Sequence, residues 1–277
     1  MKGYLIDLDG TLYRGNEPIP HAAAFIANLH RNQLPYLLVT NNSSRTSEQV
    51  SLHLAELGID VPPGFIYTSS QAAAQYLLEH PENPERSEYA ERRRVAVIGE
   101  TGLKTALEAA GFELTEDNPE TLVQGIDRDF TYAKLTAAVN HLRAGALYVL
   151  TNPDHMLPSG PGFMPGAGSL AAAITTASGV QPVIIGKPSP IIMNYAIRKL
   201  GLAASDVWVI GDNADTDIKG GELAGCKTAL VLTGVATSDN VKEQLSRAGV
   251  QPHLICKDLH EFSLEVFGNS YRPPSSL

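Results

Sequence analysis

Short apolar segments alternate with helical segments along most of this chain of 277 residues. Segments such as 35–40 and 95–99 are almost continuously apolar, without the strict apolar–polar alternation of a sheet that has one face in water. Between them lie longer stretches with apolar residues at helical spacing, for example 189–200. This order predicts an α/β fold with a doubly wound, mostly parallel, Rossmann-like sheet. Such sheets bind ligands at the carboxyl ends of their strands.

The composition favours a packed protein and disfavours some partners. Hydrophobic residues make up 43% of the chain and charged residues 18%, which is typical of a chain with a core. The net charge of −9 argues against nucleic acid or an anionic membrane as the main partner. An anionic small substrate stays compatible, because a bound metal and a few basic residues can reverse the local field.

Cysteine usage and hydropathy bear on the compartment. Cys226 and Cys256 are far apart and match no metal-ligand pattern, so we expect two buried thiols in a reducing environment. No apolar run approaches the length that spans a membrane, and no leader pattern precedes the first apolar segment. We therefore expect a cytoplasmic protein without a membrane partner.

A change in composition divides the chain. Residues 80–94 are polar, with two prolines and clustered charges, and are typical of a domain boundary. A second series of strand and helix patterns follows, in which the Gly/Pro-rich segment 152–168 is expected to be a loop. The tail from Gly268 is expected to fray. The sequence thus predicts a smaller α/β domain inserted into the core domain, with the first part of the core at 1–79, the insert at 80–180 and the second part of the core at 181–277.

Carboxylates follow the predicted strands at their carboxyl ends. Asp7 and Asp9 follow the first apolar segment and precede Gly10, where the chain can turn. Two like charges that lie close together repel each other unless a cation or a proton intervenes, and oxygen ligands suit Mg²⁺. An Asp-Gly turn with solvated carboxylates is the alternative. Thr40 and Asp212 also end apolar segments, so one crevice could gather Asp7, Thr40 and Asp212.

Four motifs occur in a fixed order along the chain, and together they resemble the four motifs of the haloacid-dehalogenase superfamily of phosphohydrolases. The insert between the second and third motifs makes the chain similar to the NagD-like branch, which includes pyridoxal-phosphate and p-nitrophenylphosphate phosphatases. Segments 151–154 and 165–169 resemble the cap domain of that branch. The motifs are Asp7-Leu8-Asp9-Gly10-Thr11, Thr40-Asn41-Asn42-Ser43-Ser44, Gly186-Lys187-Pro188 and Gly211-Asp212-Asn213-Ala214-Asp215-Thr216-Asp217-Ile218.

The resemblance implies a Mg²⁺-dependent phosphatase that hydrolyses small phosphomonoesters, such as a sugar phosphate, a nucleotide or an aryl phosphate. It assigns the nucleophile that becomes an aspartyl-phosphate to Asp7, and the acid that later activates water to Asp9. The phosphoryl group would be bound by Thr40, the Asn41 amide and Lys187.

The same resemblance implies a metal site. Mg²⁺ would be held by Asp7, Asp212 and the backbone carbonyl of Asp9, while Asn213 and Asp217 orient the ligands. A large cap would admit only a small phosphorylated metabolite, and residues 152–168 would determine which substrate is accepted. A homodimer stays an open alternative to a monomer.

Each motif also has a plainer interpretation. Segment 40–42 alone could be a turn before a helix, and Lys187 alone could be a surface lysine. Segment 212–217 hints at calcium but lacks the Gly and the Glu of an EF-hand loop. At the level of the whole chain, the alternatives are a phosphotransferase or mutase that uses the same phosphoenzyme, and a non-catalytic metal-binding protein.

Overall fold

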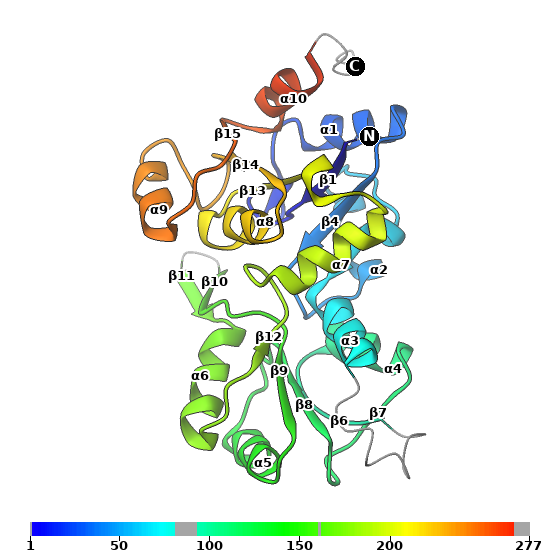
Figure 1. Ribbon diagram of the computed structural model, residues 1–277, viewed down its shortest axis with the longest axis vertical. Coiled ribbons are helices and arrows are strands. Elements are labelled where there is room, and N and C mark those ends of the chain that lie inside the picture. The colour runs from blue at the N-terminus through cyan, green and yellow to red at the C-terminus, as the bar shows by residue number, and fades with distance from the viewer. Residues whose placement is uncertain (1, 81–92, 160–161, 269–277) are drawn as a thin grey trace. The chain divides into compact units, whose positions relative to one another are not determined.

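The chain folds into two compact units, each with its own parallel sheet (Figure 1). The computed structural model describes residues 2–80, 93–159 and 162–268. Within them, the first unit consists of residues 2–40, 47–67 and 187–268. The second unit consists of residues 41–46, 68–80, 93–159 and 162–186.

The sheet of the first unit has six strands in the order β15-β14-β13-β1-β4-β5. From β1 the chain continues to β4 and β5 on one side and later adds β13, β14 and β15 on the other. The strand order therefore reverses between β1 and β13, which run parallel from Gly3 opposite Val207 to Ile6 opposite Ile210. This confirms the predicted doubly wound fold. The strands are β1 (Gly3–Ile6), β4 (Tyr36–Thr40), β5 (Ile66–Thr68), β13 (Val207–Gly211), β14 (Lys227–Val231) and β15 (Leu254–Cys256).

Helices cover this sheet and complete its core. Phe262 of the last helix packs edge-on against the rings of Tyr4, Phe25 and Trp208, which joins both ends of the unit's sequence in one cluster. The helices are α1 (Ala22–Arg31), α2 (Ser47–Glu56), α7 (Pro190–Leu200), α8 (Lys219–Leu223), α9 (Val241–Ala248) and α10 (Leu259–Phe267).

Local sequence explains where these helices begin and end. The hydroxyl of Ser189 accepts a hydrogen bond from the backbone of Ile191, Pro190 starts α7, and Gly201 ends it in a left-handed conformation. Before α8 the chain forms one π-helical segment, Ala214–Ile218.

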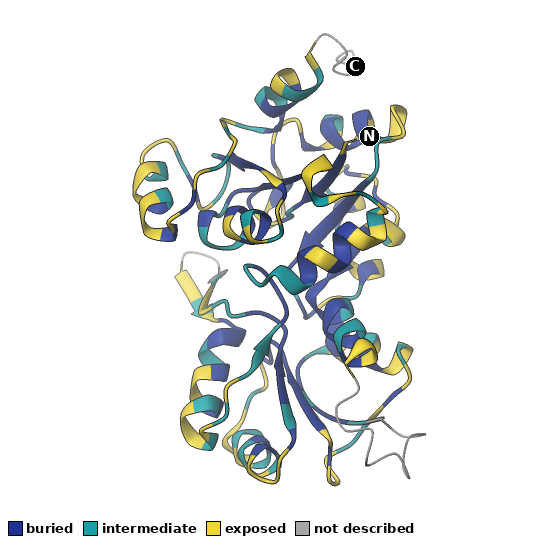
Figure 2. Ribbon diagram, in the orientation of Figure 1, coloured by how far each residue is buried: buried dark blue, intermediate teal, exposed yellow. Residues whose placement is uncertain are grey.

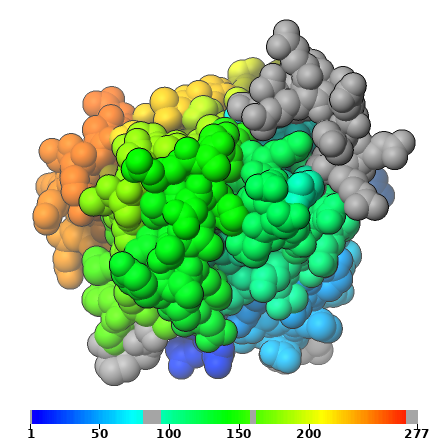
Figure 3. Space-filling view, turned by 90° about the horizontal axis from the view of Figure 1, so that it is seen from below, coloured from blue at the N-terminus to red at the C-terminus, as the bar shows by residue number. Residues whose placement is uncertain are grey.

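The second unit has a five-stranded sheet in the order β12-β9-β8-β6-β7, and its pairs are all parallel. Its strands β8 and β9 are dark blue along most of their length in Figure 2, whereas α5 and α6 expose one side. The atoms of this unit that face the viewer in Figure 3 are largely green. The elements are α3 (Ser69–Glu79), β6 (Arg93–Ile98), α4 (Thr101–Ala109), β7 (Phe112–Leu114), β8 (Thr121–Gln124), α5 (Tyr132–Arg143), β9 (Leu147–Leu150), α6 (Ala167–Ser178) and β12 (Val183–Ile184).

The structure corrects one prediction about segment 152–168. Instead of a plain loop, it contains an antiparallel hairpin of β10 (Met156–Ser159) and β11 (Gly162–Pro165), and α6 begins at Ala167. Prolines and glycines mask a strand pattern here, because an isolated hairpin can place Pro where no ladder donor is required. A second short hairpin, β2 (Tyr13–Arg14) with β3 (Glu17–Pro18), follows β1.

Three further expectations concern the predicted domain boundary and frayed tail, the two cysteines, and membrane-spanning helices. Residues 81–92 of the predicted boundary and 269–277 of the predicted frayed tail lie outside the described residues. Cys226 and Cys256 are buried free thiols, as expected. Among the helices of the described part of the chain, each is too short or too polar to cross a bilayer.

Candidate active site

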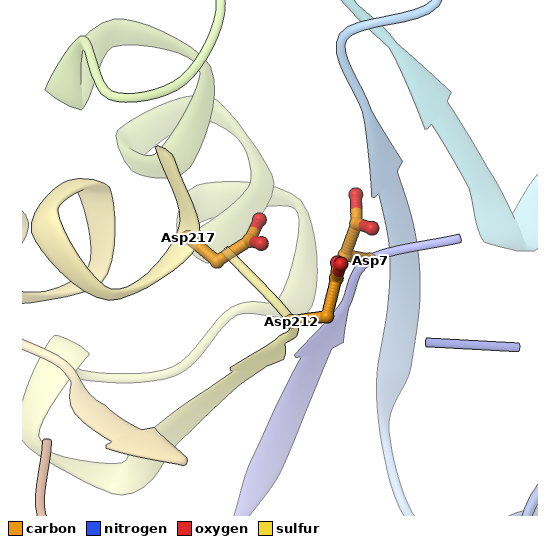
Figure 4. A group of neighbouring side chains, drawn as sticks. All are labelled: Asp7, Asp212 and Asp217. Carbon is orange, nitrogen blue, oxygen red and sulfur yellow. The ribbon is translucent and has the colours of Figure 1, made fainter. Parts of the chain in front are cut away.

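Three carboxylates of the first unit lie together at the carboxyl ends of its central strands. Asp7 follows β1 and Asp212 follows β13, and these two strands are neighbours. Asp217 comes from the π-helical segment that follows β13. Each residue offers an oxygen within 4.8 Å of the others (Figure 4). The cluster therefore forms where the strand order reverses, as such sheets predict.

Lys187 is the cation that holds two of these carboxylates. Its ammonium donates to Asp7 Oδ1 at 2.5 Å, to Asp217 Oδ1 at 2.7 Å and to the Val39 carbonyl at 3.0 Å. The residue is only 2% exposed. Burial alone would lower the pKa of Lys187, but the charges of Asp217 and Asp7 outweigh it and raise this pKa. Lys187 is thus a buried cation and not the surface lysine of the plainer interpretation.

The cluster carries more negative charge than Lys187 balances. Burial raises the pKa of Asp7 well above its usual range, with further contributions from Asp217 and Asp212, although Lys187 opposes them. Burial, with the charge of Asp217, also raises the pKa of Asp212 to about 7. In both groups burial disfavours the ionised form most, and the neighbouring carboxylates disfavour it further because a single ammonium faces three of them.

This donor set fits a divalent metal ion. Three carboxylates that lie within 4.8 Å of one another supply the oxygen ligands that Mg²⁺ prefers, and their excess negative charge requires a cation or bound protons. The carboxylate oxygens and their net negative charge are what make the cluster suitable for such an ion. It makes the cluster a candidate Mg²⁺ site.

A loop that the sequence analysis missed fixes Asp212. The backbone N–H of Val235 donates to Asp212 Oδ2 at 2.5 Å, and that of Ala236 donates to the Asp212 carbonyl at 2.9 Å. The Thr233 hydroxyl donates to the Gly10 carbonyl at 2.6 Å, which ties this loop to the turn after β1. The available signal was its position after β14, at the same sheet edge as Asp212.

Two glycines leave room for the Asp212 carboxylate. Gly10 has a φ of +81°, which favours glycine, and a Cβ there would overlap that carboxylate. A Cβ at Gly234 would overlap it as well. The Asp-Gly pair after β1 is therefore required by the neighbouring carboxylate and does more than turn the chain.

Asp9 is not part of the three-carboxylate group. It is exposed, and Tyr13 Oη donates to its Oδ2 at 3.3 Å. This carboxylate, two residues after Asp7, is therefore accessible to water.

Asn213 supports Asp217 through the backbone. The N–H of Asn213 donates to Asp217 Oδ2 at 3.1 Å, and its side-chain oxygen accepts from the N–H of Asp215 at 2.9 Å. Asp217 itself is 1% exposed and reaches the carboxylate cluster directly. Both residues thus hold the loop after β13 in place.

Thr40 and Asn41 lie at the end of β4, but in different units. Thr40 ends the strand within the first unit and is 4% exposed. Asn41 belongs to the second unit, where its side chain donates to Asp154 at 3.3 and 3.4 Å and its carbonyl accepts from Asn152 and Ser69. The structure thus gives Asn41 a fixed backbone within its own unit.

Comparison with known proteins extends these observations. The model of the family described as haloacid dehalogenase-like hydrolase matches residues 4–113, and a related HAD-hydrolase-like model matches residues 184–262. The acid sugar phosphatase of Staphylococcus saprophyticus is 41% identical over 266 residues, which cover 96% of this chain and 98% of that protein.

Two solved structures are similar over nearly the whole chain. The p-nitrophenyl phosphatase from Archaeoglobus fulgidus has a TM-score of 0.87 and 33% identity, with 96% of this chain and 99% of that chain covered. NagD from E. coli K-12 has a TM-score of 0.83 and 33% identity, with 94% and 98% covered.

Proposed function

The chain belongs to the haloacid dehalogenase-like hydrolase family, in its NagD-like branch, and on that premise we propose that it is a Mg²⁺-dependent phosphatase of small phosphomonoesters. One observation supports this activity above all others. The half-buried Asp7, the buried Asp212 and Asp217 and the buried Lys187 converge where the order of the parallel strands reverses. Hydrolysis of a phosphate monoester needs such a site, because the uncatalysed barrier exceeds the catalysed one by more than about 20 kcal/mol.

The proposed reaction has two steps. In the first, an oxygen of Asp7 bonds to phosphorus, the ester P–O bond breaks, and Asp9 gives its proton to the leaving oxygen. In the second, Asp9 takes a proton from water, the water oxygen bonds to phosphorus, and the bond between Asp7 and phosphorus breaks. The exposure of Asp9 supports this double role, since it must meet both the leaving group and water.

The other predicted site residues would bind and orient. Lys187 donates to Asp7, and we expect it also to bind the phosphoryl group that Asp7 would receive. Thr40 and the Asn41 amide would bind further phosphoryl oxygens. Loss of one such preorganised donor costs around 10²–10³ in rate.

Asp7, Asp212 and the carbonyl of Asp9 would hold Mg²⁺, and Asp217 would hold Lys187 and extend the acidic cluster. When bound, the ion offsets the repulsion between an anionic substrate and the anionic cluster. Asn213 would keep Asp217 in place.

The insert at 80–180 would act as a cap that admits small phosphorylated substrates. Sugar phosphates and aryl phosphates are the classes to test, because similar proteins are a sugar phosphatase and a p-nitrophenyl phosphatase. We place the choice among substrates in segment 152–168, whose hairpin exposes Met156 and Phe163. The domain boundaries, a cytoplasmic location and a homodimer stay predictions.

Hydrolysis of p-nitrophenyl phosphate tests the function. We expect Mg²⁺-dependent release of free phosphate, loss of activity in EDTA, and a drop of at least about 10³-fold in Asp7→Asn. Asp206→Asn is the matched control, because Asp206 is exposed and precedes β13 at the opposite end of the strand. Undiminished activity in Asp7→Asn would rule out the aspartyl-phosphate. Phosphate that appears only on an organic acceptor would favour the phosphotransferase alternative.

A further inference from the structure

Tyr13 lies beside Asp9 because the chain turns back on itself after β1. Asp9 and Tyr13 form an isolated β-bridge, and the N–H of Gly10 donates to the Tyr13 carbonyl at 2.7 Å. This backbone pairing brings the phenol to the carboxylate, and Tyr13 Oη donates to Asp9 Oδ2 at 3.3 Å. The contact is therefore built into the turn.

The ring of Tyr13 is itself held in place. It is 6% exposed, and it packs edge-on against the ring of His53 on α2, with centroids 5.0 Å apart and planes at 90°. The backbone of Tyr13 also pairs with Pro18 in the short hairpin of β2 and β3. A fixed phenol can therefore restrain a carboxylate that has little packing of its own, since Asp9 is exposed.

Thr11 is the other hydroxyl residue in this turn. It is fully buried, and its Oγ1 has no hydrogen-bond partner among the residues that the structure describes. Among the described contacts, Tyr13 donates a hydrogen bond to Asp9 and Thr11 does not.

From this geometry we infer that Tyr13 is a positioning residue for Asp9, and the inference rests on the proposed function. Because the phenol donates to Oδ2 of Asp9, the proton that Asp9 transfers is carried by Oδ1. The hydrogen bond is compatible with both states of Asp9, because Oδ2 accepts from the phenol whether Oδ1 is protonated or ionised. Tyr13 keeps its own proton throughout and acts only by fixing the carboxyl group.

The effect of Tyr13 on the rate of the first step should therefore depend on the leaving group of the substrate. A basic alkoxide must receive the proton of Asp9 as the P–O bond breaks, whereas p-nitrophenolate carries its charge without that help. Misorientation of Asp9 therefore slows the first step for alkyl phosphates and spares it for p-nitrophenyl phosphate. A loss of general stability or of substrate binding would affect both alike.

The test compares kcat/KM for p-nitrophenyl phosphate, phenyl phosphate and glycerol phosphate in the parent protein and in Tyr13→Phe. We expect a fall of about tenfold with glycerol phosphate and less than about twofold with p-nitrophenyl phosphate. Tyr36→Phe is the matched control: Tyr36 is 1% exposed, belongs to the same unit and bonds through its hydroxyl to His30. That variant should change no ratio between substrates.

A double-mutant cycle guards against an indirect effect. If Tyr13 acts through Asp9, Tyr13→Phe has no further leaving-group effect in an Asp9→Asn background. An equal fall for all three substrates, no fall at all, or an undiminished effect in the Asp9→Asn background overturns the inference. The proposed function fails by a different result, namely full activity of Asp7→Asn, so the two failures are distinguishable.

Discussion

Replacement of Asp212 by Asn tests whether the carboxylate cluster destabilises the folded chain. Asp212 is 3% exposed, and burial together with the charge of Asp217 raises its pKa from 3.8 to about 7. Between these two values the folded chain binds more protons than the unfolded chain. The free energy of unfolding without metal therefore falls as pH rises from about 4 to about 7, and stays low above pH 7.

The magnitude follows from the two pKa values. Each pH unit between 3.8 and about 7 is worth about 1.4 kcal/mol, so the cost of the ionised carboxylate approaches roughly 4 kcal/mol above pH 7. Asn can still accept the hydrogen bond from the Val235 N–H, but it carries no charge. In EDTA at pH 8 we expect Asp212→Asn to be more stable than the parent protein by about 2–4 kcal/mol. This difference should shrink toward zero as pH falls to about 4.

The assay uses the single tryptophan of the chain, Trp208, which lies on β13 and is buried. Its fluorescence reports unfolding of the first unit, so urea titrations from pH 5 to pH 8 give the difference directly. Mg²⁺ at 100 times its dissociation constant should add about 2.7 kcal/mol to the parent protein and little to Asp212→Asn. Asp206→Asn, on an exposed residue, is the control. A stability difference that does not vary with pH, or a less stable Asp212→Asn at pH 8, would refute the reasoning.

Two further predictions concern the same cluster. Lys187→Met should lower the free energy of unfolding in EDTA by about 3–5 kcal/mol, because it leaves Asp7 and Asp217 without their shared cation. This change is opposite in sign to that of Asp212→Asn. Urea titration followed by Trp208 fluorescence measures it, and an unchanged free energy of unfolding would contradict the prediction. Gly234→Ala should weaken Mg²⁺ binding in calorimetry by about tenfold or more, because its Cβ overlaps Asp212. Gly64→Ala, where a Cβ meets open space, should bind Mg²⁺ like the parent protein.

Topology explains why much of the site could be predicted from sequence. Parallel strands end at one edge of a sheet, so residues that follow β1 and β13 had to meet if those strands were neighbours. Asp7 and Asp212 are such residues. The distance of Asp217 could not be predicted, because it depends on a π-helical segment for which the sequence has no clear signal.

The features that could not be predicted from sequence depend on backbone groups or on irregular strands. The loop after β14 holds Asp212 with the N–H groups of Val235 and Ala236, which any residue except proline supplies. The hairpin of β10 and β11 contains Pro158 and Pro165, which disfavour a strand in any propensity argument. The sequence around Tyr13 gives no sign of its hydrogen bond to Asp9, which depends on the β-bridge that brings the two residues together.

Lys187 does not compensate the charges of the three carboxylates equally. Lys187 binds Asp7 and Asp217, whereas Asp212 receives backbone N–H donors and no cation among the described contacts. The charge of Asp212 therefore depends on an added ion. Since the pKa of Asp212 is about 7, a cation that binds there near neutral pH must displace a proton from part of the molecules. Binding of the ion and release of that proton are thus coupled, and the affinity for Mg²⁺ should fall as pH drops below 7.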